Sequence, residues 1–89
     1  MRAPRPNPSA GGAALAVDMA AAGPLWMTVH DLAGRSVRTL ESGAWRPAGT
    51  HVRVWDGRDA QGRRLAAGVY FVRVRTDRGQ DERRVIRLE

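Results

Sequence analysis

The chain has 89 residues, enough for one small domain with a modest hydrophobic core. Its formal net charge of +6 comes from fifteen basic residues, all arginine, which are spread along the sequence rather than gathered in a tail. The chain holds no cysteine, which excludes disulfides and thiolate metal sites, and it has no apolar run long enough to cross a membrane.

The first twelve residues, MRAPRPNPSAGG, are rich in proline and glycine. They predict an extended lead-in before a single domain over residues 13–89. Apolar side chains at Leu15, Val17 and Met19 then alternate with small or charged ones. This period of two predicts a strand with one buried face.

A hairpin is predicted over residues 24–41. In its first arm the face expected to lie inward holds Leu25, Met27 and Val29, and a half-exposed His30 is expected on the other face. Asp31 and Gly34 then occupy the first and fourth positions of a type I turn. An aspartate there accepts backbone hydrogens, and a glycine there takes positive φ.

Glycine and proline in residues 42–49 predict a connection, which leads to a strand ending at Trp55, a residue expected in the core. The segment Asp59-Ala60-Gln61-Gly62-Arg63 repeats the Asp-x-x-Gly-Arg spacing of residues 31–35 and predicts a second turn of the same kind. The β-branched and aromatic run over residues 68–76 predicts the main core strand, and residues 82–89 predict a last one.

Short strands separated by turn signals, with no helical window, predict an all-β protein. We expect an immunoglobulin-like (fibronectin III-like) antiparallel β-sandwich of about six to seven strands.

Asp56 and Asp59 are the candidates for a metal or acid–base site, because loop carboxylates are ligands that calcium prefers. Their spacing does not match an EF-hand loop, and Arg58 and Arg63 beside them would repel a divalent cation. We therefore expect both aspartates to accept backbone N–H groups in turns.

Other chemistry finds little support in the sequence. No serine lies in a nucleophile-elbow pattern, and no glycine pattern typical of a phosphate-binding loop occurs. Too few aromatic residues accompany the arginines to predict nucleic-acid binding. We expect no enzymatic activity, no cofactor and no metal.

Five segments occur in a fixed order along the chain: PNPS at 6–9, VHDLAGRSVRTL at 29–40, GTHVRVWDGRDAQGR at 49–63, AAGVYFVRV at 66–74 and RRVIRL at 83–88. Together they resemble the C-terminal sorting domain of type IX secretion substrates and the similar immunoglobulin-like domain of the flagellar hook-capping protein. The residues that carry this resemblance are Pro6, Asn7, Pro8, Asp31, Gly34, Arg35, Trp55, Asp56, Gly57, Asp59, Gly62, Gly68 and Tyr70.

The Pro-Asn-Pro box, and a closing strand followed only by Glu89, favour the sorting domain. This resemblance implies a non-enzymatic module, fused to a larger N-terminal cargo, that outer-membrane translocation and anchoring machinery recognises. It also implies a location outside the cell or on its outer surface. The element expected to be recognised is an exposed edge strand formed by Arg83, Arg84, Val85, Ile86, Arg87 and Leu88.

Three alternatives remain beside the sorting domain: a hook-capping assembly domain, an adhesive or polysaccharide-binding sandwich that uses exposed Trp26, Trp45 and the arginines, and a plain spacer. The chain departs from the family pattern at Ser9, where phenylalanine is usual, and at Arg53, where an apolar residue is usual. The second departure leaves open which face of this strand turns inward, and a local bulge near Trp55 would resolve the conflict.

Overall fold

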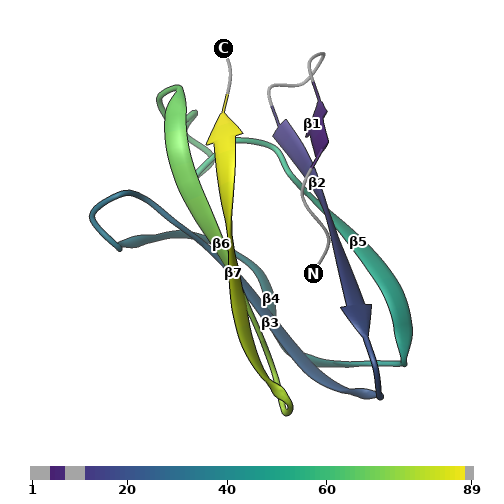
Figure 1. Cartoon of the computed structure of the whole chain (residues 1–89). Coiled ribbons are helices and arrows are strands. Elements are labelled where there is room, and N and C mark those ends of the chain that lie inside the picture. Colours follow the sequence, from purple (N-terminus) through teal and green to yellow (C-terminus); the bar gives the residue numbers. More distant parts are fainter. Residues whose placement is uncertain (1–4, 8–11, 88–89) are drawn as a thin grey trace.

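The computed structural model describes residues 5–7 and 12–87, and this part of the chain forms seven strands and no helix. The strands are β1 (Arg5–Asn7), β2 (Gly12–Met19), β3 (Gly23–His30), β4 (Ser36–Arg46), β5 (Gly49–Trp55), β6 (Gly68–Thr76) and β7 (Gly79–Arg87). They pair as two antiparallel sheets, β1-β2-β5 and β4-β3-β6-β7, which face each other in Figure 1. The predicted all-β sandwich is confirmed.

Part of the predicted lead-in joins the smaller sheet. Strand β1 pairs with the start of β2, with Pro6 opposite Ala13. Pro8 and Ser9 lie outside the described residues, as does Leu88 near the other end.

The core forms where the alternating apolar faces of the two sheets meet. Strand β2 and strand β3 each bury every second residue, as their period of two predicts. Each large aliphatic side chain moved out of water in this way contributes about 1.5–3 kcal/mol. The buried cluster comprises Ala13, Leu15, Val17, Met19, Leu25, Met27, Val29, Trp55, Tyr70, Val72, Val74 and Val85.

Strand β5 turns a different face inward from the one its valines suggest. Val52 and Val54 are 55% and 60% exposed, whereas Arg53 lies on the same face as the buried Trp55. The pairing of β5 with β2 runs without interruption from Trp55 to Gly49, so the bulge suggested near Trp55 does not occur. No bulge is needed because the Arg53 guanidinium has a partner in the other sheet, described below.

The connection predicted over residues 42–49 is wrong in its first half, because β4 continues to Arg46 along β3. Gly43 has a φ of 87°, and the β3–β4 register shifts between Leu25 and Trp26. A Cβ atom on Gly43 would come within 2.9 Å of Trp26 Nε1. The glycine therefore does not end the strand: it accommodates an irregularity and leaves room for the indole ring.

Candidate functional site

Two Asp-x-x-Gly-Arg turns share one pattern of hydrogen bonds. In the first turn, Gly34 N donates to Asp31 O (2.9 Å), Asp31 N to Arg35 O (3.0 Å) and Arg35 N to Asp31 Oδ1 (2.9 Å). The Arg35 side chain adds a fourth hydrogen bond to this turn, since its Nε donates to Asp31 Oδ2 at 3.2 Å. The predicted turn at residues 31–34 is confirmed, with Gly34 at a φ of 87°.

The second turn repeats each of these contacts. Gly62 N donates to Asp59 O (3.0 Å), Asp59 N to Arg63 O (2.9 Å), and Arg63 N and Nε to the two carboxylate oxygens of Asp59 (2.9 and 3.0 Å). Gln61 N adds a further bond to Asp59 Oδ1 at 2.9 Å. The expectation that Asp59 accepts backbone N–H groups is confirmed.

These contacts shift the acidity of both aspartates. At Asp31 the backbone N–H of Arg35 is the largest influence and lowers the pKa below its ordinary value of 3.8. At Asp59 burial acts in the opposite direction, but the N–H groups and guanidinium of Arg63 outweigh it, and the pKa is again lowered. Both carboxylates are therefore charged at neutral pH and engaged in holding the turns.

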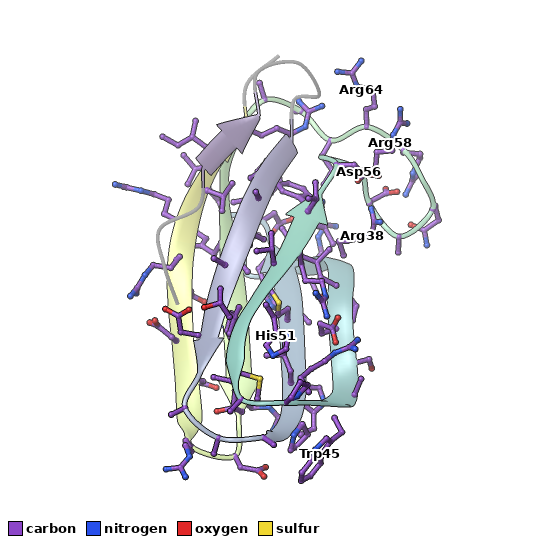
Figure 2. The ribbon with its side chains drawn as sticks, turned by 90° about the vertical axis from the view of Figure 1, so that its right-hand side faces the viewer. Arg38, Trp45, His51, Asp56, Arg58 and Arg64 are labelled. Carbon is purple, nitrogen blue, oxygen red and sulfur yellow. The ribbon has the colours of Figure 1, made fainter. Side chains whose placement is uncertain are left out.

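The Trp55-Asp56-Gly57 segment ties the end of β5 to the loop that follows. Trp55 Nε1 donates to Arg58 O at 3.0 Å, and Asp56 Oδ1 accepts both Arg58 N (3.0 Å) and Arg38 Nη1 (2.9 Å). Figure 2 shows Arg38 and Asp56 close together at this end of the sandwich. Although burial opposes it, this contact set lowers the pKa of Asp56, so the carboxylate is charged and bonded to an arginine rather than open to a cation.

The described residues contain no group of three or more metal-ligating side chains. Asp56 and Asp59 each contact an arginine, as Arg38–Asp56 (2.9 Å) and Arg63–Asp59 (3.0 Å). The two carboxylates therefore stabilise the backbone of the loop after β5.

Tyr70 closes the same end of the molecule from β6. Its hydroxyl donates to Ala66 O, four residues upstream, at 2.7 Å, and its ring packs edge-on against Trp55 with centroids 5.2 Å apart. A tyrosine near the start of the sixth strand that bonds back to the preceding loop is typical of immunoglobulin-like sandwiches.

His30 differs from expectation, since it is buried rather than half exposed. Its Nε2 lies 2.7 Å from Thr28 Oγ1, and its Nδ1 lies 3.3 Å from Gly34 O. The imidazole thus braces the first turn.

The predicted recognition strand lies at the edge of the larger sheet as β7, and Arg84 and Ile86 are exposed on it. Arg87 departs from this role because only 4% of it is exposed, and its Nε donates to Gly57 O at 3.2 Å. The end of β7 therefore secures the loop after β5 and is not available to a partner at this position. A Cβ on Gly57 would overlap with this Nε, which accounts for a glycine there.

Of the two tryptophans expected on the surface, only Trp45 is widely exposed, at 70%. Figure 2 shows it projecting from the end of β4. The ring of Trp26 is half buried and covered by the Arg75 guanidinium, 4.1 Å from its centroid. The described surface thus does not present the pair of open indoles that the polysaccharide-binding alternative requires.

A partly buried ion cluster that the sequence analysis missed joins the two sheets. Glu41 of β4 accepts Arg46 Nε and Nη2 at 3.0 and 3.1 Å and also binds Arg53 Nε of β5. Burial alone would raise the pKa of Glu41, but the two guanidinium groups lower it below its ordinary 4.5. One feature of the sequence could have indicated this cluster. Arg53 lies two residues before Trp55, on the strand face expected to turn inward, and an arginine there needs an acidic partner.

Two facing antiparallel sheets, the Tyr70 corner and the buried Trp55 define the class of this protein as an immunoglobulin-like β-sandwich. The chain matches the FlgD Ig-like domain over residues 5–80, and it belongs to this family. No significant match to a curated protein was found.

Two solved structures are similar to this chain. FlgD from P. aeruginosa matches with a TM-score of 0.66 and 22% identity, over 84% of this chain and 58% of that one. FlgD from Xanthomonas campestris, whose structure was described for insights into hook capping essential for flagellar assembly, matches with a TM-score of 0.65 and 30% identity, over 86% and 56%. The chain thus spans less than two thirds of the length of either structure.

These matches support the hook-capping alternative of the sequence analysis. They give no support to the type IX sorting domain.

Proposed function

We propose that this chain is a non-enzymatic assembly domain of the hook-capping kind. The observation that carries the proposal is the family match over residues 5–80, and the 30% identity to X. campestris FlgD supports it. Its partners are proteins of an assembly outside the cell, in place of outer-membrane translocation machinery.

The described surface is consistent with the proposed non-enzymatic role. Large apolar side chains are exposed at separate places, with Val52 and Val54 on β5 and Ile86 on β7. The carboxylates at the candidate site are engaged with arginines and backbone N–H groups. In the described residues there is also no helix long and apolar enough to cross a membrane. Apolar side chains scattered in this way are common on folded domains, so the proposal rests on the family match rather than on these side chains.

A domain exchange tests this proposal. The Ig-like domain of X. campestris FlgD is replaced by this chain, and the chimera is expressed in a strain that lacks its own FlgD. We expect electron microscopy to show hooks and soft-agar plates to show recovered swimming, while a chimera with Trp55→Ala restores neither. A chimera that is folded and abundant but yields no hooks contradicts the proposal.

A second experiment separates assembly from sorting. The chain is fused to the C-terminus of a reporter in a host with a working type IX secretion system. We expect the reporter to remain inside the cell. Export that depends on residues 82–89 would overturn the proposed function in favour of sorting.

A further inference from the structure

A groove of about 500 Å³ lies between the first residues of β4 and the second Asp-x-x-Gly-Arg turn. Arg35, Arg63 and Arg64 line it and are exposed, whereas Val37 and Leu65 are partly buried against the core. The loop is held beside β4 because Ala60 N donates to Val37 O at 3.0 Å. The groove therefore has a basic rim and a partly buried apolar floor.

The positive charge of this groove is only partly compensated. Its single acidic residue, Asp59, already accepts three N–H groups from within its own turn. Arg63 uses its Nε for that contact, and its two terminal nitrogens donate no hydrogen bond to the carboxylate. The Arg64 side chain makes no hydrogen bond or ion pair with any described residue. Figure 2 shows Arg58 and Arg64 projecting from this loop.

The lining indicates the chemistry of the occupant. Exposed guanidinium groups bind carboxylates through paired hydrogen bonds, and Val37 with Leu65 offers a surface to an apolar side chain. None of the lining residues is aromatic, whereas sugars and nucleic-acid bases generally stack on aromatic rings. A ligand with alternating acidic and apolar side chains would complement both the arginines at the rim and the apolar residues at the floor of this groove.

We propose that this groove binds an acidic peptide segment of a protein partner. Carboxylates of the peptide lie on Arg63 and Arg64, and an apolar side chain between them lies on Val37 and Leu65. This interaction surface is independent of the hook-capping assignment and would hold for another role of the domain.

The test uses the 89-residue chain and a short fluorescein-labelled peptide of alternating Glu and Leu, measured by fluorescence anisotropy. We expect saturable binding that weakens as salt rises. Arg64→Glu should weaken binding by about tenfold, and Arg64→Gln by about threefold. The melting temperature should stay unchanged, because the Arg64 side chain has no contact to lose among the described residues.

Arg78→Gln is the matched control, since this exposed arginine lies in the turn between β6 and β7 and its removal lowers the net charge equally. It should change the affinity by less than about twofold. An equal loss in Arg78→Gln and Arg64→Gln would overturn the proposal, because binding would then follow net charge alone.

Three further ligands test the chemistry of the occupant. Peptides of Gln and Leu, or of Glu and Ser, should each bind at least about tenfold more weakly than the Glu and Leu peptide. Alginate, an anionic polysaccharide, should not compete with the peptide at matched carboxylate concentration. Tight alginate binding that is lost in Arg64→Glu, or equal binding of the Glu and Ser peptide, would overturn the proposal.

Discussion

The two Asp-x-x-Gly-Arg turns form the same hydrogen bonds but have different surroundings. The turn at residues 31–35 lies at the free end of a hairpin, where Leu32 is 72% exposed. The turn at residues 59–63 packs beside β4, and its Asp59 is buried. The comparison shows that a short sequence determines the local conformation of the turn. We expect the tertiary contacts of each turn to determine how strongly the stability of the domain depends on it.

Each turn is also braced by a heterocyclic side chain from the preceding strand. His30 Nδ1 lies 3.3 Å from Gly34 O within the first turn, and Trp55 Nε1 donates at 3.0 Å to the carbonyl of Arg58, the residue directly before the second turn. Trp55 additionally fills the core, with 1% of its surface exposed. The second turn is therefore coupled to the core much more strongly than the first.

The largest expected effect follows from removing these two braces. Trp55→Ala should lower the free energy of unfolding by about 3–5 kcal/mol, because it leaves a large cavity. His30→Ala should cost about 1–2 kcal/mol through lost hydrogen bonds. Urea denaturation measures both, and equal losses would contradict the coupling of the second turn to the core.

A smaller difference is expected between the two aspartates. Asp59→Ala should lower the melting temperature by roughly 10 °C and Asp31→Ala by roughly 5 °C, since only the first leaves N–H groups unbonded beside the core. Differential scanning fluorimetry measures the shifts. Added calcium should change neither value nor that of the wild type, and a calcium-dependent increase would restore the metal hypothesis.

The two turn glycines should behave alike. Gly34 and Gly62 have φ values of 87° and 83°, and a Cβ at either position would meet no atom within 4 Å. Gly34→Ala and Gly62→Ala should each cost about 1–2 kcal/mol from backbone strain alone. A clear difference between the two in urea denaturation would show that the turns are not locally equivalent.

The smallest expected effect is the loss of stability at acidic pH. Asp31 and Asp59 have pKa values lowered from 3.8, so the stability they contribute is fully present above pH 3.8. It is lost as the pH falls through their lower, folded-state values. Melting temperatures measured from pH 7 to pH 2 should decline mainly below about pH 4. The decline should be shallower in both Asp31→Asn and Asp59→Asn, and a decline that begins near pH 6 would contradict this assignment.

Much of the fold could be predicted from neighbouring residues. The period of two in β2 and β3 correctly identified their buried faces, and the Asp and Gly spacing correctly identified both turns. The end of β4 was missed because Gly43 and Pro47 suggest a loop, whereas pairing with β3 carries the strand to Arg46. The inward face of β5 was left open because the apolar residues at 52 and 54 alternate with Arg53 and Trp55, and the structure shows that the two valines point outward.

The sequence by itself determined the all-β class, the turn conformations and the position of Trp55 in the core. These depend on local periodicity and on hydrogen bonds between residues a few positions apart. Only the tertiary structure decided that Glu41 pairs with Arg53 and that Arg87 holds the carbonyl of Gly57. Those partners are 12 and 30 residues apart, and they meet only when strands from distant parts of the chain are brought together.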